Sequence, residues 1–213
     1  QVKVVLSGQG ADELLGGYTR YQSELYRQFI PPVLARGAGS FAGWLGVRNE
    51  KLTRGLDAVG GADDIERFLG AYRVFGKREI AGLIGPGQDH ARERIGDLYD
   101  TLGCAALPSS IERIMSLDVR FGLADDLLLY TDKITMRHSL ECRVPILDLE
   151  LVRFIESLPY EYRVTIRNKK IIHRDYASTA LTRAIIQRKK KGFLSPTQKW
   201  FRDGGALREI LLN

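Results

Sequence analysis

The chain has 213 residues, of which 44% are hydrophobic and 27% are charged, and its formal net charge is +6. This composition is typical of a globular domain and excludes a disordered chain, and no apolar run reaches the roughly 18 residues of a transmembrane helix. The two cysteines, Cys104 and Cys142, lack the spacing of metal ligands, so we expect free thiols and a cytoplasmic protein.

The first predicted element is a strand, because residues 2–6 form a β-branched run that is typical of a strand buried on both faces. Ser7-Gly8-Gln9-Gly10 follows without a spacer, and the next helix carries Asp12 and Glu13 in its first turn. Such a junction presents unpaired backbone N–H groups and favours phosphate binding. Two acids beside a phosphate require a divalent cation such as Mg²⁺. Alternatively, both acids only stabilise the start of the helix.

A single strand cannot bury both faces or pair both of its edges. The chain nevertheless starts, at Gln1, directly in this strand. We therefore expect further strands from outside the sequence and interpret residues 1–213 as the C-terminal portion of one domain.

The remainder is predicted to be mainly α-helical, with one core strand and a minor β element. Helices are expected at 14–30, 41–45, 63–75, 77–83, 90–102, 109–129, 149–157, 170–180 and 196–201, and an extended piece at 162–167. Pro31-Pro32 should end the first helix, whereas Asp63 and Ser109 should cap two others.

Charged and strongly apolar residues alternate densely between positions 125 and 148. Charges drawn toward a core need partners. Two internal ion pairs are therefore candidates, Asp132 with Lys133 and Glu141 with Arg143. Two interpretations stay open for this segment. It is either a helix end joined by salt bridges or the wall of a polar cleft.

Basic residues gather at 167–174 and 188–191. Together with the net charge they raise the question of nucleic-acid binding, but no aromatic platform is interleaved with them, so we do not expect it. The same bases could neutralise the triphosphate of a nucleotide. His138 and His173 lack partners at metal-ligand spacing and are interpreted as local hydrogen-bonding residues.

Four segments together resemble the synthetase domain of the glutamine-hydrolysing asparagine synthetases. They are Ser7-Gly8-Gln9-Gly10-Ala11-Asp12-Glu13-Leu14-Leu15-Gly16-Gly17-Tyr18, Thr131-Asp132-Lys133, Glu141-Cys142-Arg143-Val144-Pro145-Ile146-Leu147-Asp148 and Arg188-Lys189-Lys190-Lys191-Gly192-Phe193. The segments occur in the family's order over essentially the whole chain, with the weakest likeness between residues 33 and 105. The resemblance implies an α/β parent fold of the adenine nucleotide alpha hydrolase-like type.

The resemblance also implies a reaction. Family members activate the side-chain carboxylate of aspartate with ATP and Mg²⁺, which gives an acyl-adenylate and pyrophosphate. Ammonia from glutamine, released by an N-terminal glutaminase domain of the same chain, then displaces AMP. The expected partners are therefore small molecules, with no membrane, and a homo-oligomer stays open.

By position in the motifs, Leu6, Ser7 and Gly8 would contact ATP and Asp12 would hold Mg²⁺. Lys170 would fold back beside Asp12 and stabilise the transition state of adenylation, unless it is an ordinary solvated lysine at a helix start. The implied cleft wall comprises Glu13, Asp132, Lys133 and Arg143.

The chain departs from the family at Gln9, a catalytic position that usually holds glutamate. Glutamine keeps hydrogen bonding but cannot accept a proton at neutral pH. The family's Ser-Gly-Gly-x-Asp-Ser loop and N-terminal cysteine are also absent from the sequence. We therefore expect these residues alone to be inactive. Two alternatives remain, namely a related amidotransferase or ring-forming synthetase acting on another carboxylate, and a non-catalytic helical interaction module.

Overall fold

The computed structural model describes residues 2–30, 60–75, 77–85 and 90–188, together with residues 87, 200, 207 and 210. The chain divides into two units, residues 1–176 and 177–213. Helix α12 (Arg183–Ile186) belongs to the second unit. The predicted helix at 41–45 and most of the one at 196–201 lie outside the described residues, as does Pro31-Pro32.

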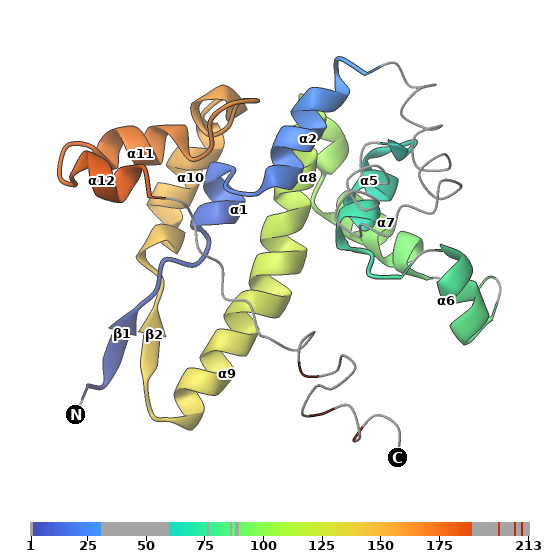
Figure 1. The fold of residues 1–213 in the computed structure, drawn as a ribbon, viewed down its shortest axis with the longest axis horizontal. Helices are drawn as coiled ribbons and strands as arrows, with labels where there is room; N and C mark the ends of the chain where they lie inside the picture. The colour runs from blue at the N-terminus through green and yellow to red at the C-terminus, as the bar shows by residue number, and fades with distance from the viewer. Residues whose placement is uncertain are drawn as a thin grey trace. The chain divides into compact units, whose positions relative to one another are not determined.

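Helices dominate the first unit (Figure 1). They are α1 (Ala11–Leu15), α2 (Thr19–Arg27), α5 (Asp64–Tyr72), α6 (Lys77–Ile84), α7 (Ala91–Thr101), α8 (Ser110–Asp118), α9 (Leu129–Arg137), α10 (Leu149–Ser157) and α11 (Ile171–Ala177), which reaches the boundary of the unit. Short 3₁₀ turns cover Cys104–Ala106, Pro145–Leu147 and Tyr160–Tyr162. Within the described ranges, no helix has the length and apolar character needed to cross a membrane.

Two short parallel strands, β1 (Val4–Leu6) and β2 (Glu141–Arg143), lie side by side (Figure 1), with Val5 opposite Cys142. Leu6 is 73% exposed and Val4 39% exposed. Among the described residues β1 is therefore not covered on both faces, and the expected further strands from outside the sequence stay a prediction. The position of β2 was not predicted, because a three-residue strand is too short to show an alternating pattern.

The predicted single helix at 14–30 is two helices instead. Gly16 ends α1 with φ 71°, in the left-handed region that favours glycine, and α2 begins only at Thr19. A Cβ atom on Gly16 would also lie 2.6 Å from the Cβ of Val164. The break lets the chain turn between the two helices and brings the 164–170 segment close to α1.

Other helix ends follow from local hydrogen bonds. Ser109 and Glu112 form a capping box at the start of α8, and the Asp63 side chain accepts a hydrogen bond from the Glu66 backbone, so both predicted caps are confirmed. Helix α10 has its predicted bounds, with Asp148 as its cap. Helix α8 continues through a π-helical segment (Val119–Leu128) into α9, well beyond the predicted end at residue 129.

The main core lies among α2, α5, α7 and α8, and a smaller one between α1 and α10. The fully buried side chains of the main core include Tyr21, Phe68, Ile111 and Leu117. In the smaller core, Leu14 and Leu15 pack with Ile155. The smaller core holds α1, and with it the loop after β1, against α10. Cys104 is buried in the main core as a free thiol.

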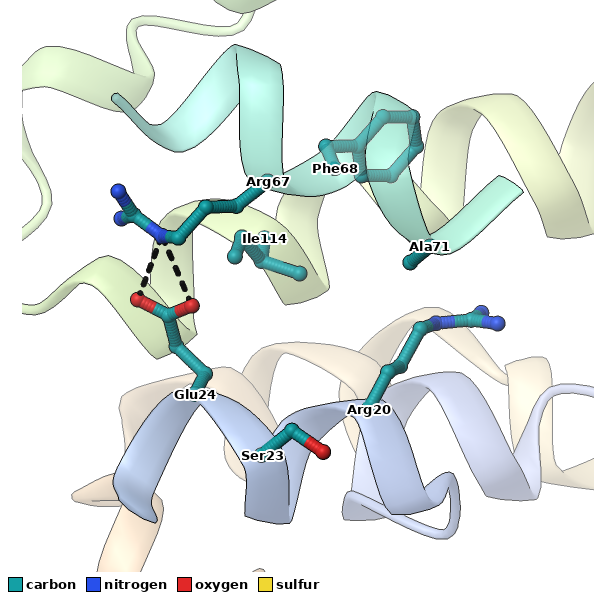
Figure 2. Close-up of a pocket in the computed structure, with 7 residues that line it drawn as sticks. All are labelled: Arg20, Ser23, Glu24, Arg67, Phe68, Ala71 and Ile114. Carbon is teal, nitrogen blue, oxygen red and sulfur yellow. Dashed lines mark hydrogen bonds and ion pairs between the residues drawn. The ribbon is translucent and has the colours of Figure 1, made fainter. Parts of the chain in front are cut away.

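A buried ion pair joins α5 to α2. Arg67 Nε donates to both carboxylate oxygens of Glu24, at 2.9 and 3.1 Å, and both residues are at most 5% exposed. The pair lies in a small pocket that Arg20, Ser23, Phe68, Ala71 and Ile114 also line (Figure 2). Because a buried charge without its partner is costly, this pair fixes which faces of the two helices meet.

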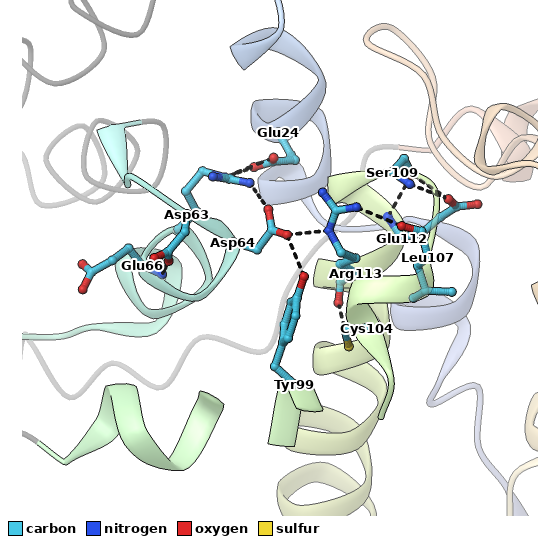
Figure 3. A network of polar contacts seen from close by, with 11 residues as sticks. Glu24, Asp63, Asp64, Glu66, Tyr99, Cys104, Leu107, Ser109, Glu112 and Arg113 are labelled. Atoms are coloured by element: carbon cyan, nitrogen blue, oxygen red, sulfur yellow. Dashed lines mark hydrogen bonds and ion pairs between the residues drawn. The ribbon is translucent and has the colours of Figure 1, made fainter. Parts of the chain in front are cut away.

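Asp64 extends this pair into a network that reaches two more helices. Its carboxylate accepts hydrogen bonds from Arg67, from Arg113 Nε at 2.5 Å and from the Tyr99 hydroxyl at 3.1 Å (Figure 3). Tyr99 belongs to α7 and Arg113 to α8. The network therefore connects α2, α5, α7 and α8 by charge-assisted hydrogen bonds.

Candidate functional site

The loop that follows β1 lies against β2 and the turn after it. The backbone N–H of Ser7 donates to the carbonyl oxygen of Arg143 at 2.8 Å. Gly10 has φ 85°, and a Cβ atom there would be 3.0 Å from Leu147 Cγ and 3.3 Å from Ile146 Cγ2. Only glycine suits this position, because the conformation is left-handed and the space is already filled. The first and third of the motif segments are thus in direct contact.

Gln9 connects the same loop to α9. Its Nε2 donates to Thr131 Oγ1 at 2.6 Å, whereas its Oε1 is buried and has no hydrogen-bond partner among the described residues. Thr131 begins the second motif segment, so the structure brings three of the four segments together around Gln9. No pattern in the sequence predicts the Gln9–Thr131 contact.

Asp12 and Lys170 meet at the start of α1. Lys170 Nζ is 3.0 Å from Asp12 Oδ1, and the two side chains are only 26% and 22% exposed. The expected proximity of these residues is confirmed, whereas their roles stay predictions. Gly17 makes the contact possible, since a Cβ at this position would overlap the Asp12 carboxylate and lie 2.5 Å from Lys170 Cε.

Lys170 has an unusual backbone. Its φ is 54°, a left-handed value that long side chains rarely adopt, and α11 begins at the next residue. Such conformations persist only where neighbouring contacts enforce them, and they concentrate at functional sites. His173 lies on the first turn of α11, where partial burial and then the charge of Lys170 lower its pKa.

The two acids of α1 have different surroundings. Glu13 is 2% exposed and accepts a hydrogen bond from the Tyr18 hydroxyl, whose pKa is raised by burial and by Glu13. Glu13 therefore faces the interior and does not join Asp12 beside Lys170. Its predicted place on a cleft wall is not what the structure shows, because its carboxylate is closed off by protein.

The remaining predicted positions are mostly exposed. Leu6 is 73% exposed, and a Cβ on Gly8 would touch nothing within 4 Å, so the start of the loop is open. Arg143 Nε is 2.7 Å from Glu141 Oε1, so this pair exists, but it lies at the surface of β2 and not at a helix end. The predicted internal pair of Asp132 and Lys133 is wrong, since both are exposed and no ion pair joins them in the described part of the chain.

The described side chains limit which kind of cation could bind beside Asp12. Among the described residues, no group of three or more His, Cys, Asp and Glu side chains could hold a metal ion. Asp12 alone fits a hard cation that brings further oxygen ligands with it, as Mg²⁺ does when bound to phosphates. It does not fit a closed metal centre made only of protein ligands.

The sequence model of the asparagine synthase family matches residues 1–213. The chain is 33% identical to proteins named putative asparagine synthetase [glutamine-hydrolyzing] from Mycobacterium bovis and Mycobacterium tuberculosis, over 97% of its own length and 32% of theirs. It is 29% identical to asparagine synthetase [glutamine-hydrolyzing] 1 of Bacillus subtilis, over 95% of the chain and 32% of the relative. The chain thus spans about a third of these relatives. No solved structure matched.

Proposed function

Because the chain belongs to the asparagine synthase family, we propose that it forms the carboxylate-activating part of a synthetase that makes an amide at the expense of ATP. The substrate is aspartate and the product asparagine, with ammonia supplied from glutamine by a glutaminase domain of the same natural chain. The enzyme acts in the cytoplasm. Its fold is the adenine nucleotide alpha hydrolase-like type of the family, of which these residues form a mostly helical part with a two-stranded parallel sheet.

The contact between Asp12 and Lys170 is the observation that carries this proposal. A carboxylate and an ammonium group, far apart in the sequence, lie 3.0 Å apart beside an open glycine-containing loop. An isolated surface ion pair would need neither the left-handed backbone of Lys170 nor the glycine at position 17. The local structure therefore supports a role for this pair beyond stability.

In the proposed reaction, an oxygen of the substrate carboxylate attacks the α-phosphorus of ATP and pyrophosphate leaves. The ammonium group of Lys170 binds and neutralises the negative charge that develops on the phosphate oxygens. Asp12 would hold Mg²⁺, which supplies charge neutralisation of the phosphates when bound. Ser7 and Gly8 bind the nucleotide through the open end of the loop, and Leu6 lies beside it.

Gln9 has a different role from the glutamate that the family usually holds at this position. Its amide cannot take a proton from ammonia, but its Nε2 holds the loop on Thr131. Deprotonation of the attacking nitrogen is therefore assigned to solvent or to the departing phosphate. In this second step ammonia attacks the acyl-adenylate and AMP leaves.

The test is pyrophosphate release by the complete natural chain that contains these residues. With ATP and Mg²⁺ we expect release that depends on aspartate, together with asparagine formation when glutamine or ammonia is added. If pyrophosphate is released with a different acid, that acid is the substrate instead of aspartate, and activation of a carboxylate by ATP still holds. Absence of release with every acid tried would reject the proposed function.

A further inference from the structure

Lys170 is presented at the end of a small hairpin. The segment from Val164 to Lys169 closes on itself through an antiparallel bridge between these two residues. Inside it, the Thr165 N–H donates to the Asn168 carbonyl at 2.8 Å, and the Asn168 N–H donates to Thr165 Oγ1 at 3.1 Å. Lys170 directly follows this compact hairpin. The position of the hairpin therefore determines the position of the Lys170 Cα atom, from which the side chain extends.

Two contacts fix the hairpin on the first unit. At its base, Val164 is fully buried against the backbone of Gly16. At its tip, the side-chain amide of Gln22 on α2 donates to two successive carbonyl oxygens, Thr165 O at 3.2 Å and Ile166 O at 2.8 Å. Thr19, one turn earlier on the same helix, accepts a weaker bond from Lys169 Nζ at 3.3 Å.

We propose that Gln22 is a positioning residue for Lys170, which holds the hairpin tip on α2 and thereby keeps the lysine ammonium group beside Asp12. This inference rests on the proposed function and deepens it. A primary amide carries two N–H donors on one nitrogen and can serve two carbonyls at once, which neither a hydroxyl nor a carboxylate can do. Without these donors the hairpin tip is free to move, and the left-handed conformation of Lys170 loses one of the contacts that enforce it.

The first test uses catalysis in the complete natural chain. Gln22→Met keeps the length of the side chain and removes both donors, and it should lower kcat for pyrophosphate release by about 10- to 100-fold with little change in the KM for ATP. In a Lys170→Ala background, Gln22→Met should lower kcat no further, because Gln22 acts through that lysine. Ser23→Ala, which removes a side-chain hydrogen bond internal to α2, is the matched control and should keep the wild-type rate.

The second test needs no catalysis. Brief acetylation of the protein with acetic anhydride, followed by mass spectrometry, measures how accessible and reactive Lys170 is. A lysine held against a carboxylate should react slowly, so Gln22→Met and Asp12→Asn should both accelerate modification of Lys170, whereas Ser23→Ala should not. Gln22→Asn, whose shorter side chain cannot reach both carbonyls, should lie between wild type and Gln22→Met and serves if the methionine variant does not fold.

The outcomes separate the two proposals. If the wild-type chain releases no pyrophosphate, the proposed function fails, while the acetylation rates still decide whether Gln22 positions Lys170. If Lys170→Ala lowers the rate of pyrophosphate release but Gln22→Met matches wild type in both tests, the role of Gln22 is overturned. Equal effects of Gln22→Met with and without Lys170 would likewise overturn it, because they would show a general effect on stability.

Discussion

Gly17 lies directly against the carboxylate of Asp12, and a Cβ atom at position 17 would be 2.8 Å from Asp12 Cγ. We therefore predict that Gly17→Ala separates Asp12 from Lys170 and lowers the rate of pyrophosphate release by about tenfold or more. Gly82→Ala is the matched control, because a Cβ on Gly82 in α6 meets nothing within 4 Å. Equal rates for the two alanine variants would contradict the prediction.

Asp12→Asn should abolish Mg²⁺-dependent adenylation and leave the fold intact. The neutral amide oxygen is a much weaker ligand for Mg²⁺ than the charged carboxylate. Its effect on stability should stay near 1 kcal/mol or less, because the Asp12–Lys170 pair is partly exposed. Pyrophosphate release measures the first effect and urea denaturation the second. A normal rate in this variant would rule out the metal role of Asp12.

Gln9→Glu should change the rate of amide formation more than the affinity for ATP. The new carboxylate can accept a proton from the attacking nitrogen, and the Thr131 hydroxyl can donate to it. Asparagine formation and the KM for ATP measure the two effects. Thr131→Val serves as the control, since it breaks the same contact without adding a base. If Gln9→Glu leaves amide formation unchanged, the side chain only packs the loop.

Glu24→Ala should destabilise the protein by about 3 kcal/mol, because it removes one of the two carboxylates that neutralise the buried Arg67 guanidinium and leaves Asp64 as the other. Arg92→Ala removes an ion pair with Asp63 in which both side chains are nearly half exposed, and it should cost about 1 kcal/mol or less. Urea denaturation at neutral pH provides both values. If the two variants lose similar free energies of unfolding, the buried ion pair contributes no more to stability than the exposed one.

His173 should make stability depend on pH. Its pKa lies below the ordinary 6.5 in the folded protein, because partial burial and the Lys170 charge both disfavour the imidazolium form. The unfolded chain therefore binds the proton more readily, so the contribution of this residue is present above pH 6.5 and is lost as the pH falls through the lower folded value. His173→Gln should make the free energy of unfolding, measured by urea denaturation, depend less on pH. Lys170→Met should raise the pKa of His173, measured by NMR titration.

The features that the sequence predicted are those encoded within a few residues. Asp63 and Ser109 predicted the starts of α5 and α8, because a cap is a local hydrogen bond. The pairing of β1 with β2 joins residues near position 5 to residues near 142, and three-residue strands carry no pattern that could reveal it. The break at Gly16 was not predicted, because apolar residues recur at helical spacing on both sides of it.

In the candidate site, too, contacts between distant parts of the chain could not be predicted from local patterns. The proximity of Asp12 and Lys170 was predicted through family resemblance and not through any local pattern, since the contact joins distant parts of the chain. The bond between Gln9 and Thr131 and the bonds from Gln22 to two carbonyls leave no trace in the sequence. A side chain that binds backbone carbonyls recognises a conformation and not a residue type, so only the folded structure reveals it.

The π-helical segment Val119–Leu128 makes the length of the helical rod between α8 and α9 critical. Removing one residue from it would rotate α9 about the axis of the rod and shorten the rod. Thr131 would then turn away from Gln9, although neither residue had been altered. The segment thus sets the phase of α9, and single-residue deletions within it should be as harmful to the loop as substitutions at the loop itself.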